Sequence, residues 1–202
     1  MIRIVIANQK GGVGKTTSAI NIATAVAAVG WRTLLVDMDP QGNASTGLGI
    51  PSGDRDYSTY DLLMREGTAA QCIQKTRIPK LDIIPATQDL SGAEVELVGE
   101  ADRVDRLKST LAEADASYDV CFVDCPPSLG LLTLNALSAA DSLLVPLQCE
   151  FFALEGLSQL LQTVERVQQG INPTLEIIGV TLTMFDRRNR LTDQVAEDVR
   201  EC

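Results

Sequence analysis

The chain has 202 residues, enough for one domain with a substantial core, and 45% of them are hydrophobic while only 4% are aromatic. It contains no histidine, so serine–histidine catalysis, cysteine–histidine catalysis and histidine-ligated metals are excluded. The formal net charge of −10 disfavours nucleic acid as a partner of the whole surface, although a local basic patch could still bind it.

Cysteine usage and hydropathy indicate the compartment. The cysteines at positions 72, 121, 125, 149 and 202 are odd in number and lack paired C-x-x-C spacing. This pattern indicates neither a disulfide framework nor a zinc site, and we expect buried free thiols in a reducing environment. The N-terminal apolar run is too short for a signal peptide, and no apolar span reaches transmembrane length. These features predict a cytoplasmic protein.

Short aliphatic runs alternate with helical patterns along the chain. The runs predict strands over 2–8, 33–39, 81–86, 119–125, 141–147 and 176–185. The helical patterns cover 15–29, 103–115, 130–139 and 154–169, and Gly30 is placed to end the first of them. Continuous hydrophobicity is typical of parallel strands covered on both faces. We therefore predict an α/β fold with a doubly wound, mostly parallel sheet flanked by helices, in a single domain over 1–202.

Two regions depart from this alternation. Residues 40–75 are rich in glycine, serine and asparagine and indicate an ordered functional loop with a short helix near 59–65. The last helical segment, in 192–202, is followed by no strand. We expect either a C-terminally truncated chain or a minimal version of the fold.

The stretch "NQKGGVGKTT" at 8–17 lies between a predicted strand and a predicted helix, which is the context of a phosphate-binding loop. Its glycines allow successive backbone amides to point at a phosphate, and the helix N-terminus adds the positive end of its dipole. Lys15 would reach the β and γ phosphates, Thr16 would ligate Mg²⁺, and Thr17 would hold the α phosphate.

The loop differs from the usual phosphate-loop motif because Gln9 occupies the first glycine position and a second lysine, Lys10, precedes the glycines. In this it resembles the deviant Walker A motif of the ParA/MinD group of P-loop ATPases. In that group the first lysine reaches across a dimer to the nucleotide of the partner. The resemblance assigns this role to Lys10.

The resemblance continues along the chain. Residues 34–45 are similar to switch I of the group, and 118–130 are similar to its Walker B strand and switch II. Residues 145–161 and 179–195 resemble the ParA partition branch in particular. The resemblance implies an ATP- and Mg²⁺-dependent ATPase for chromosome or plasmid partition, located on the nucleoid. It implies a homodimer in the ATP state, nonspecific DNA and a ParB-type centromere-binding protein as partners, and no membrane.

Three carboxylates follow apolar strands. Asp124 would hold Mg²⁺ through a water, as a Walker B aspartate does. The family pattern makes Asp39 the residue that orients the attacking water. Asp37, two residues earlier, is the competing candidate and would otherwise support Mg²⁺ or the phosphate loop.

The residues assigned from the loop chemistry and the resemblance form three groups. The catalytic residues are Lys10, Lys15 and Asp39; the nucleotide-binding residues are Lys10, Gly11, Gly12, Val13, Gly14, Lys15, Thr16, Thr17 and Met184; the metal-binding residues are Thr16, Asp39 and Asp124. Met184 could pack on adenine or be an ordinary core residue. The cluster Arg187, Arg188 and Arg190 is either a DNA-binding patch or a solvated surface.

Other functions remain open on the sequence. A MinD-like membrane-cycling ATPase would carry an amphipathic membrane helix, for which 192–202 is too acidic. An electron-transfer protein of the nitrogenase iron-protein type shares the lysine motif and would place a cysteine such as Cys125 on an iron–sulfur cluster. A binding-only module without turnover is a further alternative.

Overall fold

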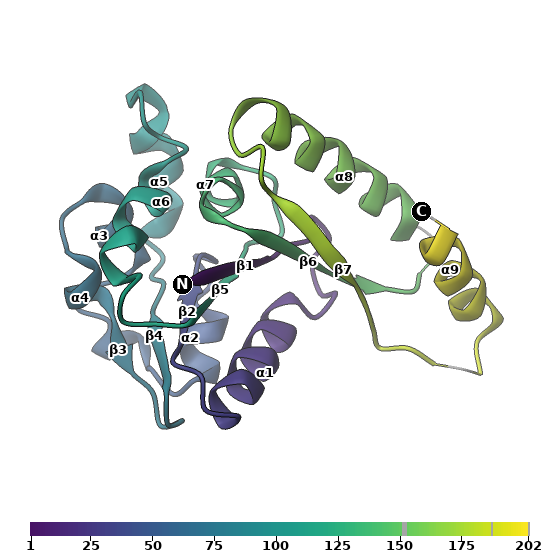
Figure 1. Ribbon diagram of the computed structural model, residues 1–202, viewed down its shortest axis with the longest axis horizontal. Coiled ribbons are helices and arrows are strands. Elements are labelled where there is room, and N and C mark those ends of the chain that lie inside the picture. Colours follow the sequence, from purple (N-terminus) through teal and green to yellow (C-terminus); the bar gives the residue numbers. More distant parts are fainter. Residues whose placement is uncertain (151–152, 187, 202) are drawn as a thin grey trace.

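The computed structural model describes residues 1–150, 153–186 and 188–201 and contains a central sheet with helices on both faces (Figure 1). The strands are β1 (Ile2–Ile6), β2 (Thr33–Asp37), β3 (Gln74–Lys75), β4 (Leu81–Ile84), β5 (Val120–Asp124), β6 (Ser142–Gln148) and β7 (Glu176–Thr183). Their order in the sheet is β3-β4-β2-β5-β1-β6-β7. All neighbouring strands are parallel except β3, which runs antiparallel to β4.

The helices divide between the two faces of the sheet. They are α1 (Lys15–Ala28), α2 (Asn43–Gly47), α3 (Thr59–Met64), α4 (Ala69–Cys72), α5 (Leu90–Glu96), α6 (Arg106–Leu111), α7 (Leu131–Ala139), α8 (Ala153–Gly170) and α9 (Arg190–Glu201), with 3₁₀ turns η1 (Ser52–Asp54), η2 (Leu97–Gly99) and η3 (Ala112–Ala114). Helices α1 and α2 pack on one face, and α3 to α8 supply the core of the other. In Figure 1, α1 lies below the sheet, while α7 and α8 lie above it.

Each face of the sheet has its own hydrophobic core. Along β2, Leu34 and Val36 belong to the core under α3 to α8, while Leu35 between them belongs to the core under α1. Successive strand side chains point to opposite faces, so a strand covered on both sides must be apolar at every position. This explains the continuous hydrophobic runs in the sequence.

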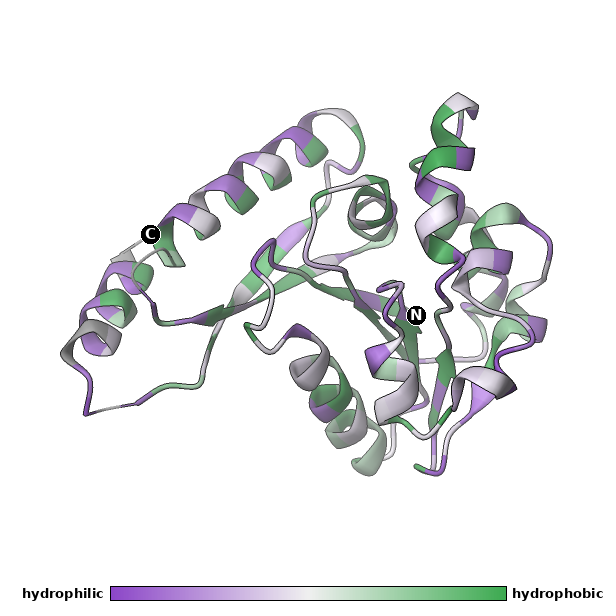
Figure 2. Ribbon diagram, turned by 180° about the vertical axis from the view of Figure 1, so that it is seen from behind, coloured by the Kyte–Doolittle hydropathy of each residue, from purple (hydrophilic) through white to green (hydrophobic). Residues whose placement is uncertain are grey.

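Helix α8 shows how a one-sided helix covers this sheet. Its buried residues are Ala153, Leu157, Leu160, Val164 and Val167, a spacing that places them along one side of an α-helix. Figure 2 shows this hydrophobic side turned toward the strands and hydrophilic residues on the outer side. Strand β7 lies at the edge of the sheet and is less covered, and its Ile178 is 52% exposed.

The predicted architecture is confirmed. Every predicted strand is present with ends that differ by at most two residues, and Gly30, with φ 107°, follows the end of α1 as expected. Residues 40–75 contain α2 and α4 in addition to the predicted α3, and α5 was not predicted. No helix in the described part of the chain combines the length and the apolarity needed to cross a membrane.

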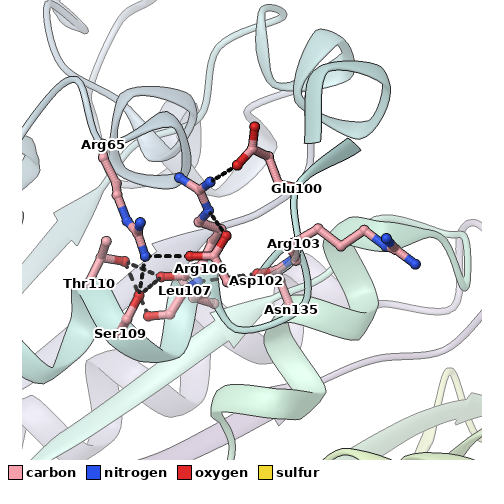
Figure 3. Close-up of polar contacts among 9 residues, drawn as sticks. All are labelled: Arg65, Glu100, Asp102, Arg103, Arg106, Leu107, Ser109, Thr110 and Asn135. Carbon is pink, nitrogen blue, oxygen red and sulfur yellow. Dashed lines mark hydrogen bonds and ion pairs between the residues drawn. The ribbon is translucent and has the colours of Figure 1, made fainter. Parts of the chain in front are cut away.

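An ionic network holds the segment before α6 against α3 (Figure 3). The buried guanidinium of Arg106 donates from Nε to Asp102 Oδ1 at 2.9 Å and from Nη2 to Glu100 Oε2 at 2.9 Å. Arg65, at the end of α3, donates to the second oxygen of Asp102 at 2.7 Å. Because Asp102 accepts from both arginines, it joins α3 to the loop that precedes α6.

The buried side chain of Asn135 fixes the same segment to α7. Its Oδ1 accepts from the backbone N–H of Leu107 at 3.2 Å, and its Nδ2 donates to the carbonyl of Arg103 at 2.6 Å (Figure 3). The loop 125–130 leads from the carboxyl end of β5 into helix α7. Asn135 therefore connects the position of α7 to the helical layer on that face.

We expect Asn135→Leu to lower the free energy of unfolding by roughly 2–6 kcal/mol, because two backbone groups lose their partners at about 1–3 kcal/mol each. Urea unfolding of the two proteins measures the difference. Ser109→Ala, at an exposed position in the same network, is the control and should change the free energy of unfolding by less than about 0.5 kcal/mol. An Asn135→Leu protein as stable as the parent would contradict the assigned bonds.

Candidate functional site

The candidate site lies where β1, β5 and β2 end side by side. Their parallel register places Asp124 opposite both Ile6 of β1 and Asp37 of β2. A cleft of about 380 Å³ opens there, lined by Gly11, Gly12, Gly14, Lys15, Thr16, Thr17, Asp39, Gln41, Asn43, Pro127 and Met184. A hollow of about 340 Å³ near α3, α4 and α6 lies away from these strand ends. The carboxyl ends of parallel strands are the expected ligand position, so we assign the site to the first cleft.

The loop between β1 and α1 is held by backbone conformation and by β7. Gly12 and Gly14 adopt left-handed φ values of 76° and 85°. A Cβ on Gly14 would lie 3.5 Å from the Thr183 side chain, whose hydroxyl donates to the carbonyl of Val13 at 2.8 Å. Helix α1 has no side-chain cap and no acidic residue in its first turn. The amides at its N-terminus are thus available to an anion.

Lys15 is almost fully buried, and its ammonium donates to the carbonyl of Lys10 at 2.9 Å. This bond folds the side chain back over the loop. Burial lowers the pKa of Lys15, and the charges of Asp124 and Asp39 act in the opposite direction. A buried ammonium with these neighbours is a positive group positioned for a charged ligand.

Asp124 is fully buried, and neither of its carboxylate oxygens has a hydrogen-bond partner among the described residues. Burial raises its pKa to about 7, and the charges of Asp37 and Asp39 add to the increase. The Thr16 hydroxyl and the Lys15 ammonium act against it. An unpartnered buried carboxylate beside the phosphate loop fits a divalent cation, which would supply the missing partner.

Asp37 and Asp39 differ in what they contact. Asp37 is fully buried, and its Oδ2 accepts from the backbone N–H of Ser45 at 2.8 Å and from the Ser45 hydroxyl at 2.6 Å. Its Oδ1 accepts from the backbone N–H of Asp39 at 3.2 Å. Asp39 lines the cleft and accepts from the backbone N–H of Gln41 at 3.0 Å. Asp37 thus holds α2 and its preceding loop, while Asp39 faces the cleft.

The remaining predicted residues occupy different positions. Met184 lines the cleft with φ 50° and is 63% exposed, so it is not a core methionine. Val13 is buried beneath the loop. The Lys10 ammonium forms an ion pair with the carboxylate of Glu150 in the same chain.

The arginine cluster is only partly described. Arg188 is exposed, and its guanidinium donates to both carboxylate oxygens of Asp186, at 3.0 and 2.8 Å. Arg190 begins α9, but its side chain lies outside the described residues, as does all of Arg187. In the described part of this cluster, the charge of Arg188 is therefore balanced by the carboxylate of Asp186.

Four residues at the site were not predicted from the sequence: Gln41, Asn43, Pro127 and Glu150. Gln41 and Asn43 follow Asp39 within "DPQGN", so their proximity to it was a usable signal. Glu150 pairs with a lysine 140 positions earlier, and no local pattern indicates such a contact.

The cysteines agree with the expectation of free thiols. Cys72, Cys121, Cys125 and Cys149 are free and buried, and Cys202 lies outside the described residues. Burial raises the pKa of Cys125, and the charge of Asp124 adds to the increase. A buried protonated thiol is a poor ligand for a cluster shared between subunits, which opposes the iron–sulfur alternative.

Comparison with known proteins agrees with this geometry. The family model described as "AAA domain" matches residues 1–177. The chromosome partitioning protein ParA of Caulobacter vibrioides is 58% identical over 98% of this chain and 74% of its own length. The sporulation initiation inhibitor protein Soj of Bacillus subtilis is 52% identical over 98% of this chain and 78% of its own length.

Solved structures show the same fold. Cobyrinic acid a,c-diamide synthase from Mycobacterium smegmatis, with bound ADP and magnesium, has a TM-score of 0.95 and 41% identity over all of this chain and 82% of that one. A plasmid partition protein from Borrelia burgdorferi has a TM-score of 0.85 and 29% identity over all of this chain and 86% of that one. The fold and the loop define a P-loop ATPase. Within that class, the chain belongs to the ParA/Soj family of partitioning ATPases.

The raised pKa of Asp124 predicts a pH dependence of stability in the absence of nucleotide and metal. The folded protein keeps a proton on Asp124 between about pH 4 and pH 7, whereas the unfolded chain releases it, so stability falls as pH rises through this interval. Asp124→Asn removes this effect. By pH 8 the free energy of unfolding of the variant should exceed that of the parent by up to about 4 kcal/mol, at 1.36 kcal/mol per pKa unit.

Urea unfolding of both proteins at a series of pH values tests this prediction. The difference in free energy of unfolding should be small near pH 4, grow up to about pH 7 and then stay constant. A difference that does not change with pH would show that the carboxylate is ionised throughout in the folded state.

Proposed function

We propose that this protein is an ATP- and Mg²⁺-dependent partitioning ATPase that acts in chromosome or plasmid segregation. The observation that carries the proposal is the buried, unpartnered carboxylate of Asp124, which lies close enough to the Lys15 ammonium and the Thr16 hydroxyl for both to lower its pKa. The 58% identity to a ParA protein supports the cellular role. We take residues 1–202 as one ATPase unit.

In this proposal the phosphate loop binds the nucleotide. The contacts would come from the amides of Gly11, Gly12, Val13 and Gly14 and the side chains of Lys15, Thr16 and Thr17, with Met184 beside the base and Lys10 supplied by a second subunit. Thr16, Asp124 and Asp39 would hold Mg²⁺, which keeps most of its other ligands as water and phosphate oxygens. When bound, Mg²⁺ would neutralise charge on the phosphates. Lys15 needs only to exchange the Lys10 carbonyl for a phosphate oxygen.

Asp39 is the residue we propose to orient the attacking water. Its carboxylate lines the cleft, whereas Asp37 accepts three hydrogen bonds from Ser45 and Asp39. A fully buried carboxylate engaged in three hydrogen bonds is a poorer candidate for a water-orienting role than one that lines the cleft. Asp37 would instead keep the loop that carries Asp39 in place.

We propose that Lys10 acts on the nucleotide of a second subunit, so that ATP closes a homodimer. The dimer would bind nonspecific DNA through Arg187, Arg188 and Arg190 and would release it after hydrolysis stimulated by a ParB-type partner. A dimer of this kind would be located on the nucleoid. The 58% and 52% identity to the ParA and Soj partition proteins supports this role over the MinD-like alternative.

Asp39→Ala should lower ATP turnover by about 10²- to 10⁴-fold, because the attacking water loses its oriented acceptor, while ATP still binds through the phosphate loop. Lys15→Ala is the contrasting variant and should weaken ATP·Mg binding by roughly 10- to 100-fold. Phosphate release and calorimetry measure the two quantities. Rapid hydrolysis by the Asp39 variant would move the role elsewhere, and unchanged affinity of the Lys15 variant would contradict the phosphate-loop assignment.

DNA binding should require the ATP dimer, because two copies of the arginine cluster on one face are needed to overcome the net charge of −10. Replacing the three arginines with alanine should weaken binding to any duplex and reduce the slope of log affinity against log salt by about 0.9 per lost phosphate contact. Asp186→Asn, which frees Arg188, should have the opposite effect on affinity. Equal slopes for the parent and the triple variant would make the arginines a solvated surface.

A further inference from the structure

The first limb of the phosphate loop is fixed to the adjoining strand β6. Asn8 is buried, and its Nδ2 donates to the carbonyl of Pro146 in β6 at 2.7 Å. Its Oδ1 accepts from the backbone N–H of Lys10 at 3.0 Å. A single amide side chain therefore fixes the Lys10 backbone relative to β6.

Gln9, which stands where the usual motif has a glycine, makes a second connection. Its Nε2 donates to Gln159 Oε1 at 2.8 Å and to the carbonyl of Gly156 at 3.3 Å, both in α8. A glycine at position 9 could make neither bond. The departure from the motif thus attaches the loop to the first turns of α8.

The Lys10 side chain completes this connection. Its ammonium pairs with the carboxylate of Glu150, which lies between β6 and α8. The Glu150 backbone is fixed, since its N–H donates to Gln148 at 2.8 Å and its carbonyl accepts from Ala153 at 2.9 Å. The side chains of Lys10 and Glu150 are 37% and 45% exposed, so water and other ions can reach the pair.

We propose that Glu150 is a positioning residue that holds Lys10 within its own subunit until a second nucleotide-loaded subunit arrives. The inference rests on the proposed role of Lys10 across the dimer. Asn8 and Gln9 keep the backbone fixed, so only the Lys10 side chain has to move. Dimer closure then exchanges one carboxylate for a polyphosphate of higher charge. A partly exposed pair of this kind changes an equilibrium constant by roughly two- to five-fold, which is small enough to be exchanged.

The dimer dissociation constant at saturating ATP·Mg tests this proposal. Sedimentation equilibrium is measured in the Asp39→Ala background, where turnover is suppressed. Glu150→Gln should tighten the dimer roughly two- to five-fold, because Lys10 no longer has to leave a carboxylate. Glu155→Gln removes the same charge from an exposed position in the first turn of α8 that makes no ion pair with a described residue. It is the matched control and should not change the constant.

A double-mutant comparison separates the pair from general charge effects. Adding Glu150→Gln to Lys10→Ala should change nothing, because the effect of Glu150 acts through Lys10. Glu150→Asp, which retracts the carboxylate but keeps its charge, should behave as Glu150→Gln does and guards against a folding defect in one variant. The affinity of the monomer for ATP should be unchanged in Glu150→Gln and in Glu150→Asp.

The outcomes separate the two levels of the proposal. If Lys10→Ala weakens the dimer but Glu150→Gln leaves it unchanged or weakens it, the positioning role is overturned while the role of Lys10 across the dimer stands. If Lys10→Ala dimerises as tightly as the Asp39→Ala parent, the role of Lys10 across the dimer fails, and the positioning role fails with it. Persistence of the Glu150→Gln effect without Lys10 would also overturn the inference.

Discussion

A buried carboxylate without a partner is the constraint on which the site depends. Asp124 ends a strand in the middle of the sheet, where both faces are covered and water is excluded. An ionised group in this position is costly unless a cation compensates it, and the raised pKa expresses that cost. The parallel register adds Asp37 directly opposite, which increases the local negative charge. An ionised Asp124 therefore needs a positive charge close to the point where the phosphate loop leads into α1.

Around this carboxylate the structure separates fixed groups from groups that can exchange partners. Asp37 is fixed by Ser45, and the glycine loop is fixed from the β7 side by Thr183. Lys15 and Lys10 instead contact a carbonyl and an exposed carboxylate, both of which a phosphate can replace. Because the backbone is already in place and the two lysines can exchange their partners, the site needs little reorganisation when a charged ligand binds.

The sequence indicated the sheet because its physics is local. Strands covered on both faces must be apolar on both sides, so β2 and β5 are visible in the sequence as continuous apolar runs. The short helices α2 and α4 are too brief to show a helical period, and they were not predicted. Glycine spacing indicated the loop in the same local way. Which of Asp37 and Asp39 faces the cleft depends on the contact of Asp37 with Ser45, and a local sequence pattern does not show this contact. The partner of Lys10 lies 140 positions away, so a local pattern does not show it either.

Among the side chains that the structure describes, two cations assigned to anionic partners outside their own subunit are each paired within the chain. Lys10 contacts Glu150, and Arg188 contacts Asp186. When a polyanion binds at either place, it replaces the carboxylate, which returns to water. The replacement is favourable only for a ligand that brings several negative charges close to the cation. Because both carboxylates are partly exposed, their return to water costs little. An acidic protein can in this way keep its cations from isolated anions and still present them to a polyphosphate or to duplex DNA.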